Sequence, residues 1–451
     1  MKREHWSSKF GFFFAAVGSA VGLGVLWKFP YTVGQNGGGL FLLMYILCTL
    51  LIGIPVFIAE LMIGRRSQRA SVCAFTELCQ GRTSWKVGGW FGVISSFLIM
   101  SFYSVIAGYG MSYILMSLTG MYQRYSTQEI GDVYNTLAHS GSISVLWHFL
   151  FTLITMLIVL SGVRKGIEYW SGIMTRALFV LLIGMFLYSI TLPGFGKAVE
   201  FIFYPDFENF NYSSALEALG LAFFTLSLGQ GIMISYGSYL QETSDIPKMA
   251  VVVAFSVIFV AILSSMTIFP VVFSFDLPPN AGTGMVFKTL PYLFAQLPGS
   301  LVLSTLFFTL FTFTALTSSI PFIEVVATNL MELLHWKRTK AVTLTALSTF
   351  LFGIPCALSA SGGLFPDWPL VYKQTFMQTI EGLVFVWIVP ITGFITALFV
   401  GWVVDRNISF EEFTAGEAKR GLWNVWHFFM RWVIPAVILL IILEKSKLLV
   451  H

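Results

Sequence analysis

Residues 10–31 read FGFFFAAVGSAVGLGVLWKFPY, an apolar stretch that is long enough to cross a bilayer and that glycines interrupt near its middle. Residues 215–240, ALEALGLAFFTLSLGQGIMISYGSYL, repeat this arrangement, with Ser227 to Gly231 as the interruption. Inside a membrane a helix has to satisfy its own backbone hydrogen bonds. Glycine breaks at mid-depth are therefore expected only where the freed N–H and C=O groups line a protected polar cavity. One such break in each half of the chain indicates a transporter with a substrate site at the membrane midplane.

The composition is that of a protein that crosses the membrane many times. Of 451 residues, 56% are hydrophobic and 11% are charged, whereas soluble domains carry about 25% charged residues. Lysine and arginine gather in the loops on one side, which places the N-terminus in the cytoplasm of an inner (cell) membrane protein. The partner is then the lipid bilayer; no nucleic-acid signature is present, and the sequence does not indicate an oligomeric state. Hydropathy predicts eleven spans, and this odd number places the C-terminus outside: 10–34, 39–64, 87–118, 143–161, 168–192, 214–240, 246–276, 300–334, 341–358, 375–404 and 423–443.

The positions of the two breaks predict the fold class. Spans 1 and 6 are the broken ones, so spans 1–5 and 6–10 form two halves, and because five is odd the halves have opposite topology. We expect an all-α membrane protein of one domain, 1–451, with inverted repeats at 10–192 and 214–404 and a peripheral eleventh helix at 423–443. The polar start, Met1 to Lys9, argues against a cleavable signal peptide. The histidines and cysteines lack catalytic or metal-ligand spacing, so we predict no enzyme. The four cysteines lie in predicted spans or on the cytoplasmic side, so we expect no structural disulfide.

Several short motifs follow one another between residues 3 and 404: Arg3–Trp6, Gly18–Gly24, Phe29–Tyr31, Asn36–Gly39, Gly53–Pro55 with Glu60 and Gly64–Arg65, Phe223–Gly229 and Leu316–Ser319. Together they closely resemble the neurotransmitter:sodium symporter family, in its bacterial amino-acid transporter branch with eleven transmembrane helices. The resemblance implies a sodium-coupled symporter that works by alternating access. Monoamine-transporting relatives carry an aspartate at the position of Gly22, so a glycine there implies an amino-acid substrate.

The resemblance also implies how the substrate is held. Its carboxylate would lie near the backbone of Leu23 and Gly24 and the hydroxyl of Tyr103. Its amino group would lie near the carbonyls of Ala20, Phe224 and Thr225, with Ser227 close by.

The pocket wall implied by the resemblance is mostly apolar or aromatic, which favours a neutral, hydrophobic or aromatic L-amino acid. Gln230 either contacts a polar group of the substrate or hydrogen-bonds the unwound backbone. The wall residues are Ile99, Tyr103, Phe224, Gln230, Phe313, Ser318 and Phe322.

Of the family's two sodium sites, the second maps onto the carbonyls of Gly18, Val21 and Thr314 and the hydroxyls of Thr317 and Ser318. The first site departs from the family, because its two asparagine ligands map onto Val25 and Val257, which have no side-chain oxygen. We therefore predict coupling through one Na⁺. The family's chloride site is not evident around Ala261, so no chloride requirement is expected.

Isolated charges predict the gates by the same resemblance. Lys28 and Glu381 form the outer gate, where relatives usually have an arginine in place of the lysine. Arg3 and Glu332 form the inner gate, and Trp6 plugs the inner pathway.

Two acids, Glu60 and Glu324, lie deep inside predicted spans, where an unpaired charge costs about 3 kcal/mol. Glu60 matches a family acid that braces the unwound segments. Glu324 is either structural or a proton carrier. Two other functions stay open: proton-driven or ion-uncoupled amino-acid transport by the same fold, and a non-transporting amino-acid sensor.

Overall fold

The computed structural model describes residues 4–79, 82–205, 207, 212–279, 285–416 and 420–447. Over these residues the chain is helical, without a β-strand, apart from one isolated bridge between Gly38 and Pro205. The predicted all-α membrane fold is confirmed. The four cysteines are free thiols.

Within the described residues, nine helical segments are long and apolar enough to cross a membrane, and the bent pair α1/α2 makes a tenth. The shorter pair α12/α13 occupies the position of the predicted sixth span. The first five comprise α1 (Lys9–Ala20) with α2 (Phe29–Gln35), α3 (Gly39–Cys48) with α4 (Ile54–Ser67), α6 (Lys86–Leu118), α9 (Gly141–Leu160) and α10 (Tyr169–Ile190). The others comprise α12 (Tyr212–Thr225) with α13 (Ile232–Gly237), α14 (Ile246–Ser274), α16 (Ser300–Leu334), α17 (Arg338–Ala357), α19 (Phe376–Gly382) with α20 (Val389–Leu398), and α22 (Arg420–Phe428) with α23 (Ile434–Lys447).

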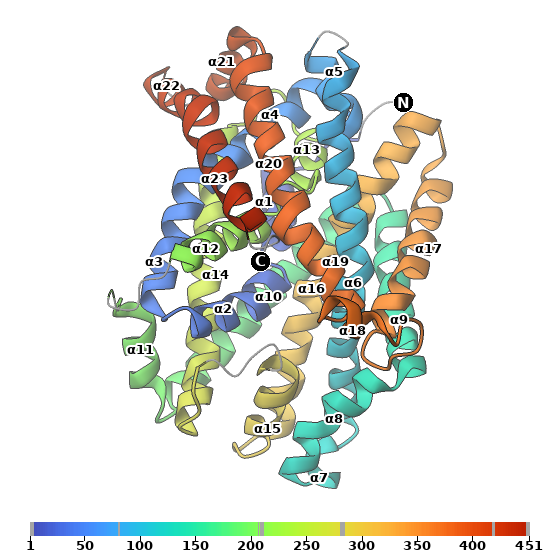
Figure 1. Cartoon of the computed structure of the whole chain (residues 1–451), viewed down its shortest axis with the longest axis vertical. Coiled ribbons are helices and arrows are strands. Elements are labelled where there is room, and N and C mark those ends of the chain that lie inside the picture. Colours follow the sequence, from blue (N-terminus) through green and yellow to red (C-terminus); the bar gives the residue numbers. More distant parts are fainter. Residues whose placement is uncertain are drawn as a thin grey trace.

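Short helices lie at the two ends of the bundle (Figure 1). One end carries α5 (Ser71–Leu78) and α21 (Arg406–Thr414); the opposite end carries α7 (Met121–Arg124), α8 (Thr127–His139), α11 (Phe195–Phe203) and α15 (Leu290–Phe294). These are the two groups of loops that the charge distribution assigns to opposite membrane faces. Another short helix, α18 (Trp368–Tyr372), precedes α19.

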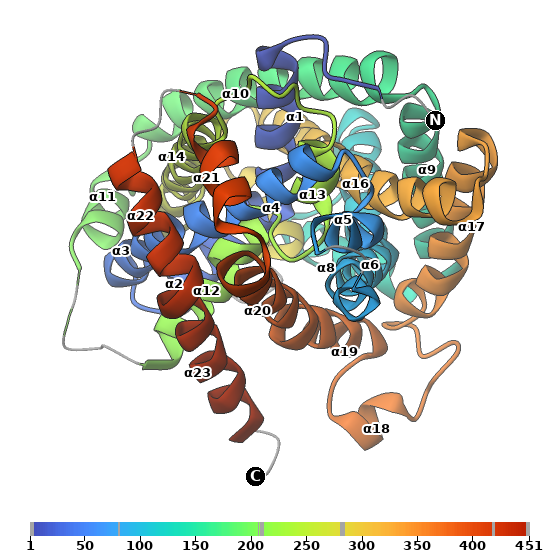
Figure 2. The same cartoon turned by 90° about the horizontal axis from the view of Figure 1, so that it is seen from above.

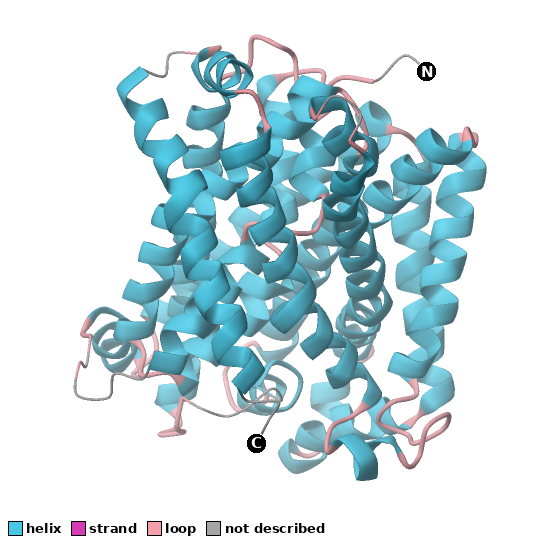
Figure 3. Cartoon of the chain, turned by 45° about the horizontal axis from the view of Figure 1, so that its top comes forward, coloured by secondary structure: helices cyan, strands magenta, loops and turns pink. Residues whose placement is uncertain are grey.

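Seen along the bundle, α1, α4, α13 and α16 lie near the middle, whereas α11, α17 and α23 lie at the periphery (Figure 2). Loops gather at the two ends, but short loop segments also cross the middle of the bundle (Figure 3). Helices α6 and α16 pack along one another and form one wall of this centre.

Both predicted breaks are present. Helix α1 ends at Ala20, and the segment Gly24–Gln35, a π-helical turn followed by α2, is bent by 45° relative to α1. Between α12 and α13 the backbone is left-handed at Ser227 (φ 55°), Gly229 (φ 70°) and Gly231 (φ 71°). Glycine adopts this conformation without steric cost. A Cβ on Gly229 would also lie 2.5 Å from the carbonyl oxygen of Val389, so the second break depends on this glycine.

Candidate substrate and ion site

The two breaks meet each other and α16. The hydroxyl of Ser227 donates to the carbonyl of Ser19 at 3.1 Å, and the hydroxyls of Ser19 and Ser227 are also 3.1 Å apart. From α16, the Ser318 hydroxyl reaches the carbonyl oxygens of Ser19 at 2.9 Å and of Gly18 at 3.2 Å. Three elements distant in sequence therefore share one polar centre.

The glycines of the first break leave no room for side chains. A Cβ on Gly22 would lie 2.5 Å from Oγ of Ser318 and 3.3 Å from the hydroxyl of Tyr103. A Cβ on Gly24 would lie 2.6 Å from the ring of Phe224. Between them, the N–H of Leu23 donates to the Tyr103 hydroxyl at 3.2 Å. The structure thus brings together residues of both breaks and of α6 that the resemblance assigned to one substrate site.

Aromatic rings surround this polar centre. Tyr103 meets Phe322 edge-on, with centroids 5.6 Å apart, and Phe224 meets Phe385 with centroids 4.3 Å apart. Ile99 is fully buried one turn before Tyr103 on α6. Phe313 on α16 is partly buried, and its carbonyl accepts the Thr317 hydroxyl at 3.1 Å. Phe385 was not predicted as a site residue, because no motif surrounds it in the sequence.

The polar side chains of the second break differ in whether they have hydrogen-bond partners. The hydroxyls of Thr225 and Tyr45 are 2.8 Å apart. The backbone carbonyl of Gln230 accepts the Ser96 hydroxyl at 2.6 Å. The side chain of Gln230 is 1% exposed, yet neither amide atom has a hydrogen-bond partner among the described residues. Its amide therefore does not bond the described unwound backbone, which was one of the two alternatives.

Four residues of the predicted second sodium site, Gly18, Thr314, Thr317 and Ser318, lie close together. The Thr317 hydroxyl is 3.0 Å from the carbonyl of Thr314, and a Cβ on Gly18 would lie 3.1 Å from Cβ of Thr317. Val21 caps the end of α1 and is buried. With Ser318 bonded to Gly18, the set consists of uncharged carbonyl and hydroxyl oxygens, which suits a hard monovalent cation such as Na⁺.

At the predicted first sodium site, apolar side chains stand where the family has ion ligands. Val25 and Val257 are both fully buried, and neither side chain offers an oxygen. The hydroxyl of Ser264 on α14 donates to the carbonyls of Val25 at 3.1 Å and Ala261 at 3.0 Å. The carbonyl that the break frees at Val25 is therefore satisfied by a hydroxyl.

The residues of the predicted outer gate are in contact. Nζ of Lys28 lies 3.0 Å from Oε1 of Glu381, and the two side chains are 30% and 24% exposed. The ammonium also lies 4.2 Å from the ring centre of Phe385 and 5.9 Å from that of Phe224. The ion pair therefore lies against the two rings that border the first break.

At the opposite end, Trp6 is 3% exposed. Its Nε1 donates to the carbonyl of Tyr236 at 3.1 Å, and its backbone N–H donates to the carbonyl of Tyr239 at 3.1 Å. Arg3 lies outside the described residues. The carboxylate of Glu332 accepts hydrogen bonds from the guanidinium of Arg69 at 3.3 Å and from the backbone N–H of Ala70 at 2.7 Å.

Both intramembrane acids have partners. Oε1 of Glu60 accepts the N–H of Gly229 at 2.8 Å, so this acid holds the second break. Glu324 is fully buried; it lies 2.6 Å from the guanidinium of Arg338 and accepts the hydroxyl of Tyr239 at 2.7 Å. This pairing favours the structural alternative for Glu324. The sequence did not reveal Arg338 as a partner because it belongs to the next helix.

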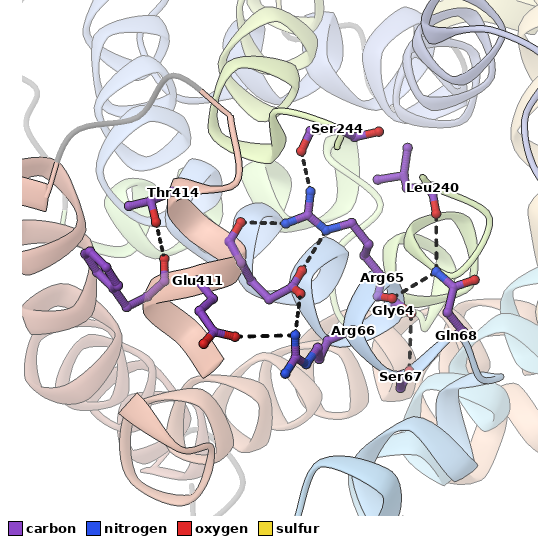
Figure 4. Close-up of polar contacts among 11 residues, drawn as sticks. Gly64, Arg65, Arg66, Ser67, Gln68, Leu240, Ser244, Glu411 and Thr414 are labelled. Carbon is purple, nitrogen blue, oxygen red and sulfur yellow. Dashed lines mark hydrogen bonds and ion pairs between the residues drawn. The ribbon is translucent and has the colours of Figure 1, made fainter. Parts of the chain in front are cut away.

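The sequence analysis also missed a polar cluster at the end of the bundle that carries α5 and α21 (Figure 4). Arg65, 2% exposed at the end of α4, donates to Oε2 of Glu412 at 2.6 Å and to the carbonyl of Ser244. Gln68 donates to the carbonyl of Leu240 at 3.2 Å. The cluster joins α4 to α21 and to the loop between α13 and α14. In the sequence analysis Arg65 appeared only as part of a motif, and its contact with Glu412 was not predicted.

A bundle of membrane-spanning helices with two facing mid-membrane breaks is the architecture of a secondary transporter. The model of the sodium:neurotransmitter symporter family matches residues 3–127 and 121–449. The chain belongs to this family.

The relatives cover nearly the whole chain. An uncharacterized sodium-dependent transporter of Bacillus subtilis, YhdH, is 36% identical over 99% of both chains. An uncharacterized sodium-dependent transporter of Haemophilus influenzae is 32% identical over 98% of both chains. The crystal structure of MhsT in complex with L-phenylalanine superposes with a TM-score of 0.91 at 36% identity, covering 98% of this chain and 99% of that one. The chain is accordingly a multi-pass, sodium-dependent membrane transporter and not an enzyme.

Proposed function

We propose that this protein is a symporter that couples one Na⁺ to the uptake of a neutral, hydrophobic or aromatic L-amino acid. The observation that carries the proposal is the meeting of the two breaks beside Tyr103 and Ser318. Free N–H groups and carbonyls at half-helix ends bind the carboxylate and the ammonium of a zwitterion. The carboxylate lies by Leu23, Gly24 and Tyr103.

The wall residues select the side chain of the substrate. Phe224, Phe313, Phe322 and Ile99 offer apolar contact, which favours a hydrophobic or aromatic group over a charged one. The complex of MhsT with L-phenylalanine, at 36% identity, supports this class. The buried amide of Gln230, which has no hydrogen-bond partner among the described residues, offers a hydrogen bond to a polar group on that side chain.

One Na⁺ binds at the second site, among the oxygens of Gly18, Val21, Thr314, Thr317 and Ser318. The valines at positions 25 and 257 leave the first site without the two amide oxygens that asparagines supply in the family, and no chloride is required. Proton-driven or uncoupled transport remains the second candidate because of these valines.

Transport proceeds by alternating access. Na⁺ favours the outward-open state, and substrate joins the two breaks so that Lys28 and Glu381 close above it. Release to the cytoplasm follows when Trp6 leaves its site between α1 and α13 and the contact between Arg3 and Glu332 opens. The N-terminus is cytoplasmic and the C-terminus lies outside.

Counterflow in proteoliposomes with a panel of amino acids, with and without a sodium gradient, tests the substrate and the ion. We expect apolar or aromatic L-amino acids to exchange only with sodium present. Paired ²²Na⁺ and substrate fluxes test the coupling, and a ratio near one is expected. Two Na⁺ per substrate would contradict the one-site proposal, and equal exchange without sodium would favour the proton-driven or uncoupled alternative.

A further inference from the structure

Two π-helical turns face one another where the tenth and eleventh spans meet. One, Phe399–Val403, follows α20, and the other, Phe429–Val433, joins α22 to α23. A Cβ on Gly401 would lie 2.7 Å from Cα of Arg431, so the two backbones are in direct contact. Nε1 of Trp402 also donates to the carbonyl of Arg431 at 3.0 Å. Arg431 is therefore held in a defined position, on the kind of turn that is frequent at functional sites.

The positive charge of Arg431 lies inside a span, and no acid of the chain balances it. Its guanidinium lies 4.2 Å from the ring centre of Trp402 and 5.8 Å from that of Trp432. Within the residues that the structure describes, no ion pair joins Arg431 to a carboxylate, and its buried Nε has no hydrogen-bond partner. An unpaired charge in a span costs about 3 kcal/mol. The aromatic rings offset part of this cost, but the Nε–H group still lacks an acceptor.

Two more buried nitrogen atoms on the same side of this helix lack partners. Trp423, His427 and Arg431 follow one another at a spacing of four residues, which places them on one helix face. The rings of Trp423 and His427 are buried and stacked, with centroids 5.1 Å apart. In the described part of the chain, neither Nε1 of Trp423 nor Nδ1 of His427 has a hydrogen-bond partner. Because buried polar groups are normally hydrogen-bonded, this face suits a ligand with several oxygen atoms.

The charges around this face favour an anion. The guanidinium of Arg406, at the start of α21, lies 5.1 Å from the ring centre of Trp423 and adds a second positive charge. The acid next to it in the sequence, Asp405, caps α21 by accepting the backbone N–H of Asn407 at 2.7 Å. Two guanidinium groups here disfavour the ammonium of a zwitterionic headgroup.

Lipid has access to this face. Helices α22 and α23 lie at the periphery of the bundle (Figure 2). Trp402 is 49% exposed, Trp432 is 53% exposed and Phe428 is 55% exposed. Asp405 follows Trp402 closely and begins the loop that is predicted to be cytoplasmic. Tryptophan is typical of the headgroup level of a membrane, so Arg431 lies near the headgroups of the inner leaflet.

We propose that this face binds an anionic glycerophospholipid of the inner leaflet. Its phosphate accepts charge-assisted hydrogen bonds from Arg431 beside the rings of Trp402 and Trp432. The hydroxyls of the headgroup lie toward His427, and the acyl chains follow Trp432 and the exposed Leu439 toward the membrane centre. The lipid thus supplies the negative charge that the chain does not.

Native mass spectrometry of the full-length protein with phosphatidylglycerol and with phosphatidylcholine of the same acyl chains tests the proposal. We expect preferential retention of phosphatidylglycerol. Arg431→Gln should lower the affinity for phosphatidylglycerol about fivefold, the effect of one basic group near anionic lipid, and leave that for phosphatidylcholine unchanged. Lys340→Gln is the matched control, because Lys340 is an exposed cation on the same predicted face and lies 4.3 Å from the ring centre of Trp336. It should leave retention unchanged.

Trp432→Ala keeps Arg431 and removes one exposed ring, so the affinity for phosphatidylglycerol should fall about two- to fivefold. Gel filtration and thermal unfolding check that each variant is folded, and Trp432→Ala tests the site by itself if Arg431→Gln does not fold. Wild-type retention in either folded variant would overturn the proposal, as would an equal loss in Lys340→Gln or equal retention of the two lipids by the wild type. Displacement of phosphatidylglycerol by excess inorganic phosphate would also overturn it, because the site would then bind a free anion. None of these measurements depends on the transported substrate.

Discussion

Gly24→Ala tests whether the first break and the outer gate act together. The new methyl group would lie 2.6 Å and 2.7 Å from two ring carbons of Phe224, whereas carbon atoms in contact prefer about 3.5–4.0 Å. The ring therefore has to retreat by about 1 Å. Its movement is restricted, because the ring centre of Phe385 lies 4.3 Å from that of Phe224 and the Lys28 ammonium lies 4.2 Å from the ring centre of Phe385.

Overpacking of this kind costs about 1–3 kcal/mol. If the cost falls on the closed, substrate-bound state, the apparent affinity for substrate drops by about five- to 140-fold. Equilibrium binding of a radiolabelled substrate from the counterflow panel, in sodium, measures the change. Gly220→Ala is the control, since a Cβ on this α12 glycine meets nothing within 4 Å.

A double-mutant cycle decides between local overlap and a general effect on folding. Phe224→Val removes the two ring carbons that the methyl group meets. In this background Gly24→Ala should cost much less than it does alone. If the loss is the same in both backgrounds, or if Gly24→Ala binds like the wild type, the reasoning about Phe224 is refuted.

Three further predictions follow from other contacts. Lys28→Arg offers a bidentate partner to the outer acid, so substrate dissociation should slow by about two- to fivefold in a washout assay; faster release would contradict the gate. Glu324→Gln breaks the buried pair with Arg338 and should lower the free energy of unfolding by about 3 kcal/mol, the low end for buried pairs because Arg338 stays 20% exposed. Residual transport should keep its pH profile, whereas a proton carrier at this position would lose it. Val25→Asn/Val257→Asn should raise the Hill coefficient for Na⁺ from about one toward two, and an unchanged value would argue against a lost first site.

The sequence was sufficient for the architecture because its strongest signals are local. An apolar run interrupted by glycines identifies a broken span wherever it occurs, and both breaks lie where they were predicted. Lys28 and Glu381 are 353 residues apart in the sequence. Their contact was predictable only from the resemblance to the family.

Other contacts could not be predicted from the sequence, because they depend on how the helices rotate and pack. Arg65 and Glu412 are 347 residues apart, and no motif links them. Glu324 and Arg338 lie on either side of a helix end, so their pairing depends on the turn between α16 and α17. Phe385 is one apolar residue among many in its span. Its importance follows from ring geometry, which hydropathy does not encode.

The two valines and the satisfied carbonyl beside them support each other. A break in a membrane helix frees backbone oxygens that need a partner, since lipid provides none. By the family resemblance, Na⁺ and asparagine side chains occupy this region in relatives. Here the Ser264 hydroxyl donates to the carbonyl of Val25, and the valines fill the space with hydrocarbon. The carbonyl of Val25 thus has a hydrogen-bond partner within the chain itself. This contact supports the proposal that Na⁺ couples to transport only through the site between α1 and α16.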